Sequence, residues 1–137
     1  MTDVAHITLL EFAMRIKNVL TREFASSTWV VSEISELKVN NSGHCYLDLV
    51  EKKGDQIAVR VGGVIWAANY RKLRQKFLSA TGAEISQGMK LLLKVAVNFS
   101  EAYGLKLIVH DIDPSYSLGE MERQRKETIE RLSREGV

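Results

Sequence analysis

The segment "SGHCYLDLV" (residues 42–50) alternates in polarity, and this alternation decides how the rest of the chain is interpreted. Successive side chains of a β-strand point to opposite faces. The two resulting sets are Cys45, Leu47 and Leu49 on one face and His44, Tyr46 and Asp48 on the other. The apolar set predicts a core-facing strand, and a free cysteine in such a place usually behaves as a small buried hydrophobic side chain.

The same segment is a poor candidate for a metal or catalytic site. His44 and Cys45 are adjacent in a strand, so they point apart and cannot easily reach one ion. The other two histidines, His6 and His110, lie in other elements without ligand spacing, and there is no second cysteine. We therefore expect no catalytic residue, no metal and no cofactor in this chain.

Turn residues lie on both sides of this strand, which is predicted over 44–52. "NNSG" (40–43) and Lys53-Gly54-Asp55 contain the Asn and Gly that tight turns favour, so the second turn predicts a hairpin. Further strands are predicted from runs that alternate or are rich in β-branched residues. They are "TWVVSEISELKV" (28–39), "QIAVRVGGVI" (56–65), "MKLLLKVAVNF" (89–99) and "LKLIVHDID" (105–113).

Three helices complete the prediction. Thr8 to Glu11 forms a capping-box pattern before a helix over 9–24, whose apolar face is expected to pack on the domain. A second helix is predicted over 66–78, followed by a loop over 79–88. Its aromatic face is interpreted as core and its cations as solvated. A second capping-box pattern, Ser117 to Glu120, predicts a charged connector helix.

Composition restricts the class of protein. A chain of 137 residues suits one domain, and a net charge of +2 is too small to argue for nucleic acid by itself. One cysteine excludes an internal disulfide and fits a reducing compartment. The start "MTDVAHITLL" has no signal-peptide pattern and no apolar run is long enough for a membrane span, so a cytoplasmic protein is expected.

Five strands, with a helix between the third and fourth and a helix at each end, follow the order of an OB-fold. This fold is a five-stranded Greek-key barrel that commonly binds oligonucleotides or oligosaccharides at its outer face and loops. The predicted division is an OB-fold domain over 1–116 and a connector helix over 117–137.

The predicted outer face combines aromatic rings with cations. Bases stack on rings and cations follow phosphates, so this combination favours binding of single-stranded nucleic acid. The barrel also serves sugars and proteins, and strands often carry exposed lysines, so a protein-interaction module stays open. The candidate residues are Lys38 in the first loop, Phe99 and Tyr103 in the loop joining the last two strands, and His44, Tyr46, Arg60, Lys94 and Lys106 on the strands.

Several short motifs resemble one family. They are "WVVSEIS" (29–35), "SGHCYLDL" (42–49), Gly88, "YGLKLIV" (103–109), "DP" (113–114), "LG" (118–119) and the terminal "EGV". Together they resemble the N-terminal domain of the exodeoxyribonuclease VII large subunit, from about Ile7 to Val137. The chain departs from that pattern at Ser32, at Cys45 and in a longer 66–87 segment. The positions that match the family's binding side are Glu33, Ser42, Gly43, His44, Tyr103 and Gly104.

The resemblance implies an OB-fold that presents single-stranded DNA to a nuclease domain. It also implies a parent enzyme that degrades single-stranded DNA from both ends into oligonucleotides, together with several copies of a small subunit. In that family the nuclease domain and the small-subunit-binding region follow this domain. No catalytic residue is therefore carried over to this chain, and no membrane partner is implied.

Overall fold

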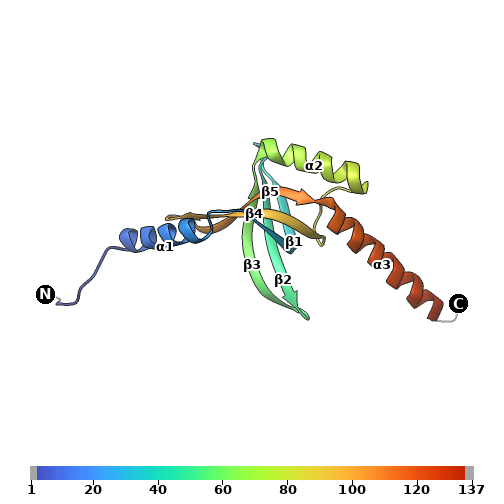
Figure 1. The fold of residues 1–137 in the computed structure, drawn as a ribbon, viewed down its shortest axis with the longest axis horizontal. Helices are drawn as coiled ribbons and strands as arrows, with labels where there is room; N and C mark the ends of the chain where they lie inside the picture. Colours follow the sequence, from blue (N-terminus) through green and yellow to red (C-terminus); the bar gives the residue numbers. More distant parts are fainter. Residues whose placement is uncertain (1–2, 135–137) are drawn as a thin grey trace.

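A computed structural model describes residues 3–134, and its centre is a five-stranded β-barrel (Figure 1). The strands are β1 (Thr28–Val39), β2 (Cys45–Lys53), β3 (Gln56–Ile65), β4 (Lys90–Ser100) and β5 (Gly104–Asp113). The helices are α1 (Leu9–Glu23), α2 (Ala67–Thr81) and α3 (Pro114–Arg134). The sequence-based order of elements is therefore confirmed.

The barrel closes in the order β1-β2-β3-β5-β4, with β4 returning to β1. All neighbouring pairs are antiparallel except β3 and β5, which run parallel. This mixed closed barrel, with a helix between β3 and β4, confirms the predicted OB-fold. The β2–β3 hairpin and the β4–β5 hairpin both extend past the closed part of the barrel (Figure 1). Closure removes most unpaired strand edges.

Alternating side chains fill the barrel interior, as the sequence predicts. Cys45, Leu47 and Leu49 are at most 4% exposed, which places their face of β2 in the core. Helix α2 covers one end of the barrel and contributes Leu73 and Phe77 to the same cluster. Ala67 is the first residue of α2, so Trp66 precedes the helix and is exposed, and its predicted place in the core is wrong.

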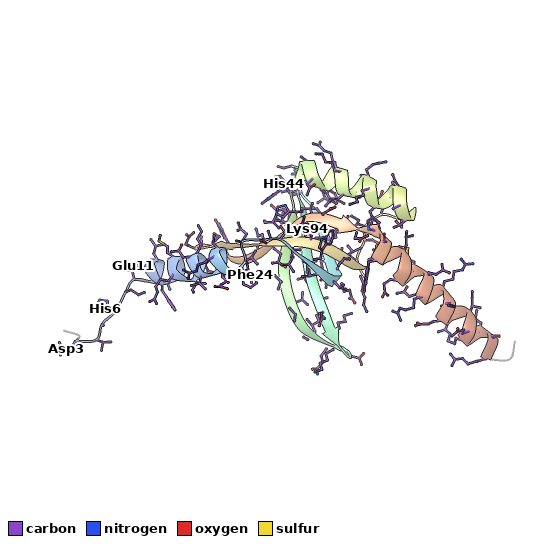
Figure 2. All side chains as sticks on the ribbon, in the orientation of Figure 1. Asp3, His6, Glu11, Phe24, His44 and Lys94 are labelled. Carbon is purple, nitrogen blue, oxygen red and sulfur yellow. The ribbon has the colours of Figure 1, made fainter. Side chains whose placement is uncertain are left out.

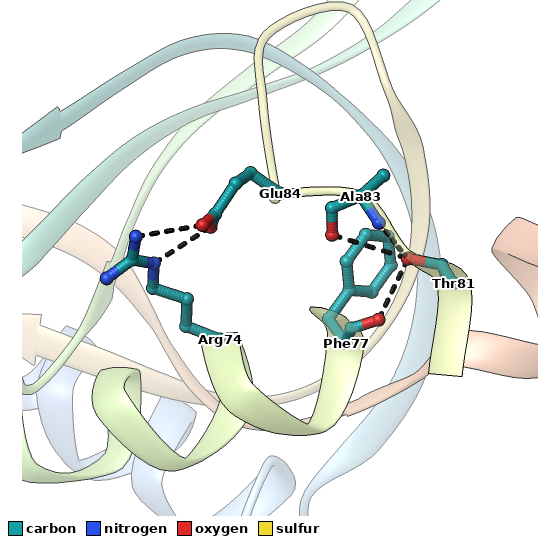
Figure 3. A network of polar contacts seen from close by, with 5 residues as sticks. All are labelled: Arg74, Phe77, Thr81, Ala83 and Glu84. Carbon is teal, nitrogen blue, oxygen red and sulfur yellow. Dashed lines mark hydrogen bonds and ion pairs between the residues drawn. The ribbon is translucent and has the colours of Figure 1, made fainter. Parts of the chain in front are cut away.

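The connection from α2 to β4 is held by side-chain contacts (Figure 3). Arg74 donates two hydrogen bonds of 2.8 Å to the carboxylate of Glu84, and these bonds lower the pKa of Glu84. The hydroxyl of Thr81 donates to the Phe77 carbonyl oxygen at 2.8 Å and accepts from the amide of Ala83. Ile85, which follows this network, is 6% exposed and belongs to the core.

Helix α1 does not pack its apolar face on the barrel, so this prediction is wrong. No residue of α1 is buried, and the helix extends away from the barrel beside the β4–β5 hairpin (Figure 1). A 3.0 Å ion pair joins Lys17 to Glu101 in the turn of that hairpin. The predicted cap is present, because the Thr8 hydroxyl accepts from the Glu11 amide at 3.1 Å.

Helix α3 begins three residues earlier than its predicted cap. The carboxylate of Asp113 accepts from the amide of Ser115 at 2.9 Å, and Pro114 occupies the first helical position, where a missing N–H costs nothing. Ser117 therefore lies inside the helix and is 3% exposed. The last predicted helical residues, 135–137, and the first two residues of the chain lie outside the described part.

Candidate nucleic-acid interface

Tyr46 is the centre of a polar face on the outside of the barrel. Its side chain is 38% exposed, and its neighbours in register are Lys38 on β1 and Val64 on β3. The ammonium of Lys106, on β5, lies 5.8 Å from the centroid of the Tyr46 ring. An ammonium at this distance from a ring is a cation–π contact. Strands far apart in sequence therefore bring one aromatic ring and two cations together.

Lys38 lies within β1, not in the first loop as the sequence predicts. Its pairing with Tyr46 fixes its side chain on the outer face, because directly opposite residues of two strands share a face. The prediction that it contributes to the binding face remains untested.

Arg60 lies on the same outer face but is already paired. Its guanidinium donates to the Oδ2 atom of Asp48, with which it forms an ion pair. The side chain of Arg60 is 53% exposed and that of Asp48 is 20% exposed. The register places Asp48 opposite Gly62, next to the Tyr46 position. Arg60 thus reaches the candidate interface as half of an ion pair.

Lys94 lies on β4, away from the Tyr46 group. It is opposite Trp29 on β1 and Asp111 on β5. Burial acts to raise the pKa of Asp111. The opposing effects are a 2.9 Å hydrogen bond from Lys76, a hydrogen bond from the Ile112 amide and the charges of Lys76 and Lys94. Together they outweigh burial, so the pKa of Asp111 is lowered. The structure therefore brings Lys94 close to an acid and not to the predicted partners on β2 and β3.

The two aromatic residues at the β4–β5 connection differ in position. Phe99 lies within β4, opposite Leu105, and is half-buried, so its predicted loop position is wrong. Tyr103 lies in the turn and is 88% exposed, so its ring is free to meet a ligand. Only Tyr103 of this pair has the exposure that a stacking platform needs.

His44 has a structural contact that the sequence pattern did not reveal. It comes just before β2 and its Nδ1 atom accepts from the amide of Ala67, at 2.9 Å, where α2 begins (Figure 2). Its ring also packs edge-on against Trp66, with centroids 5.1 Å apart. Since Trp66 offers no side-chain cap of its own, His44 caps this helix from another element.

The turn before β2 is shaped by its own polar groups. The side-chain oxygen of Asn40 accepts from the amides of Ser42 and His44, at 3.0 and 2.9 Å. Gly43 has a φ of 87°, and a Cβ there would lie 3.3 Å from the Cβ of Ala67, so glycine suits this position. The Asn40 loop and the Tyr103 turn are the two loops that OB-folds commonly use for ligands.

Three exposed positions near these groups were missed by the sequence interpretation. Trp29 and Trp66 are each 45% exposed. Gly62 is an exposed glycine in the interior of β3. The alternation of β3 indicates that Gly62 faces outward, and it lies opposite Asp48 in the structure. Trp29 carried a similar signal, because alternation places it on the strand face opposite to Ile34. For Trp66 the sequence carried no signal of exposure, because aromatic residues are usually buried.

Residues 3–134 contain no group of three or more His, Cys, Asp or Glu side chains arranged to hold a metal ion. In the same part of the chain, no helix combines the length and the apolar character that a membrane crossing requires. Glu33, one of the family-matched residues, makes a 3.1 Å ion pair with Lys52. The expected roles of the matched residues in binding remain untested.

Comparisons with known proteins agree with this geometry. Residues 7–113 match the OB-fold nucleic acid binding domain family. The exodeoxyribonuclease 7 large subunit of Deinococcus radiodurans is 36% identical over 132 residues, which cover 88% of this chain and 31% of that protein. The large subunit of Alkaliphilus oremlandii is 30% identical, over a match that covers 82% of this chain and 24% of that protein. The large subunit of Bacillus cytotoxicus is 28% identical, over a match that covers 81% of this chain and 22% of that protein.

The matched segments lie in the N-terminal part of these large subunits. The chain spans less than a third of the length of these curated relatives. The family match, in contrast, covers most of the chain and nearly the whole barrel. The chain therefore belongs to the family of OB-fold nucleic acid binding domains.

Proposed function

We propose that this chain is the single-stranded DNA-binding domain of an exodeoxyribonuclease VII large subunit, and that it binds DNA on the face around Tyr46. The observation that carries the proposal is the position of Lys106, 5.8 Å from the Tyr46 ring, with Lys38 opposite that ring. A base can stack on the ring while the two ammonium groups meet the phosphates on either side.

The charge distribution favours specific binding of single-stranded DNA over general attraction of any polyanion. The chain carries 19 Lys and Arg against 17 Asp and Glu, so its total charge offers little attraction. The positive charge that matters is local, and it is combined with an aromatic ring that only an unpaired base can reach.

The proposal extends to the parent protein through the relatives. Their names describe the large subunit of an exodeoxyribonuclease, so the parent is proposed to degrade single-stranded DNA together with a small subunit. The nuclease chemistry and small-subunit binding are assigned to regions outside this chain. A cytoplasmic location belongs to the same proposal.

A salt series on Lys106→Ala tests the function. Binding of a labelled single strand of about 12 nucleotides, a length within the range of one OB-fold, is measured by fluorescence anisotropy at several salt concentrations. The parent should bind more weakly as salt rises, because phosphate contacts release counterions. Lys106→Ala should weaken binding and reduce the salt slope by about one.

The matched control is Lys126→Ala, which removes the same charge from an exposed position on α3. It should bind DNA as the parent does. Equal behaviour of the two variants would contradict the assigned face, and no salt-sensitive binding by the parent at low salt would contradict the function.

A protein-interaction module is the second candidate, and the apolar face of α1 favours it. Phe12, Ile16 and Val19 are 40–47% exposed on this helix. A module of this kind would bind no DNA at low salt, so the same titration separates the two functions.

A further inference from the structure

No positive φ, register irregularity or close neighbour accounts for the glycine at position 62 of β3. It lies in the strand interior, where glycine weakens a strand because it has no side chain to pack. Its φ is not positive, and the irregularity in the β2–β3 register lies elsewhere, between Glu51 and Lys52. A Cβ built on Gly62 meets no atom within 4 Å, so no neighbour requires its absence.

Gly63 shows the contrast within the same pair. A Cβ on Gly63 would lie 3.0 Å from the Cδ1 atom of Leu49 in the core, so packing explains that glycine. Gly62 is exposed and points outward. An interior strand glycine often marks a bulge, a bend at a barrel corner or a place where a ligand approaches closely, and the register shows no bulge at Gly62.

The residues around Gly62 come from three strands. Asp48 on β2 is directly opposite, and Arg60 is two residues before Gly62 on β3. Tyr46 is opposite Val64, two residues after Gly62. On β5, Lys106 precedes Leu107, which pairs with Gly63. The bare backbone of Gly62 is thus surrounded by a ring, a carboxylate and two cations.

We propose that Gly62 is the floor of a subsite for one nucleobase, and that Asp48 selects a base with an exocyclic amino group. The inference rests on the proposed DNA-binding function. Asp48 favours a base over a phosphate above Gly62, because an ionised carboxylate can accept from an amino group of a base but has no hydrogen to donate to a phosphate.

Asp48 and Arg60 together determine which edge of the base can form hydrogen bonds with the protein. The ion pair engages Oδ2 of Asp48, and the carboxylate keeps a second oxygen that can accept from a ligand. Carboxylates recognise the N4 amino group of cytosine in this way. Arg60 can donate to the ring nitrogen or carbonyl beside that amino group. Uracil presents a carbonyl oxygen at the same place, which the carboxylate repels.

The test compares oligo(dC) with oligo(dU), each of about 12 nucleotides, because these pyrimidines differ at the amino position and share their size. Binding is measured by anisotropy in mildly alkaline, low-salt buffer, where cytosine stays unprotonated. The parent should bind oligo(dC) about five-fold or more tightly than oligo(dU), which is the lower end of the discrimination from one good base contact.

Asp48→Asn should bring that ratio close to one, because an amide can turn either a donor or an acceptor toward the base. It should also strengthen binding of both strands at low salt, since Arg60 is released for phosphate. A parent without preference, or an Asp48→Asn variant that keeps the full preference, would overturn the selection by Asp48.

Gly62→Val tests the floor of the subsite. It should weaken binding of both strands by about five-fold or more, as loss of one stacked base does. Ala58→Val, which places the same side chain at another exposed position of β3, should bind normally, and both variants should melt at or above the temperature of the parent. Normal DNA binding by folded Gly62→Val would overturn the subsite. In that case, weaker binding by Lys106→Ala would still support the proposed function. Absence of binding to either strand by the parent would contradict the proposed function itself.

Discussion

Tyr46 and Leu47 are neighbours in the sequence but lie on opposite faces of β2. Tyr46 is 38% exposed beside Lys106, whereas Leu47 is 4% exposed in the barrel core. The period of two in a strand accounts for this separation. A shift of the register by one residue would exchange the faces and place the proposed DNA surface in the core.

Two alanine substitutions should therefore give different results. Leu47→Ala should reduce the free energy of unfolding by about 2–5 kcal/mol, as large-to-small changes in cores do. Tyr46→Ala should leave thermal melting nearly unchanged and weaken single-strand binding by about 1–3 kcal/mol, the range for one lost stacking platform. Circular dichroism melts and DNA titrations of both variants measure this. An unstable Tyr46→Ala with a stable Leu47→Ala would show that the register is wrong.

Cys45 is expected to be chemically inert in the folded chain. Burial raises the pKa of its thiol to about 11, against a smaller opposing effect of its hydrogen bond with Tyr70. The thiolate is the reactive form, and a raised pKa keeps its population very small near neutral pH. Iodoacetamide should label Cys45 in denaturant and leave the native protein unlabelled over the same time. Rapid labelling of native protein near pH 8 would contradict the buried position.

Among the three helices, α1 depends least on the barrel. None of its residues is buried, and its ion pair with the β4–β5 turn joins Lys17 to Glu101. Surface contacts of this kind contribute little to stability. Helix α2, by contrast, places Leu73 and Phe77 in the core. The two helices have equal lengths of 15 residues but different roles in the fold.

A chain that begins at Ser26 should therefore fold as the full chain does. Its melting temperature should stay within about 3 °C, because little buried surface is lost. The matched control is Leu93→Ala, which removes a side chain that is 1% exposed and should lower the melting temperature clearly. A large drop on removal of α1 would mean that its apolar face is buried in solution.

The strands were largely predictable from the sequence, and the packing of the helices was not. Alternation located the strands because most of them bury one face, but in β3 only the last three residues are buried, and Ile57 and Val59 are 43% and 51% exposed. The apolar stripe of α1 predicted a helix but could not reveal that the barrel leaves it uncovered. The capping-box pattern at Ser117 predicted the wrong start for α3. Asp113 caps the helix earlier, and Pro114 is a favourable first helical residue.

The candidate site was predictable only in part, for a similar reason. Lys38, Tyr46 and Lys106 meet as their outward positions predict, although Lys106 is far away in sequence. The cap that His44 provides to α2 depends on the path of the chain between residues 44 and 67, which no local pattern encodes. The ion pair of Arg60 with Asp48 likewise depends on strand register.

In the proposed function, this chain binds DNA and another part of the parent protein cleaves it. The chain spans less than a third of the curated nuclease subunits that it matches, and the proposed function assigns nuclease chemistry to the rest of the protein. The purified chain should show no cleavage of single-stranded DNA, with or without magnesium, as measured by gel electrophoresis of a labelled strand. Oligonucleotide release that follows the folded protein through successive columns would contradict this division.

Single-stranded DNA is proposed to lie on the face around Tyr46, and an NMR titration can locate it residue by residue. Backbone amide spectra of the chain are recorded while a single strand of about 12 nucleotides is added at low salt. We expect the largest shifts at Lys38, Tyr46, Gly62 and Lys106, with α1 and the distal half of α3 unchanged. Shifts confined to α1 or α3, with the amides around Tyr46 unmoved, would contradict this proposal.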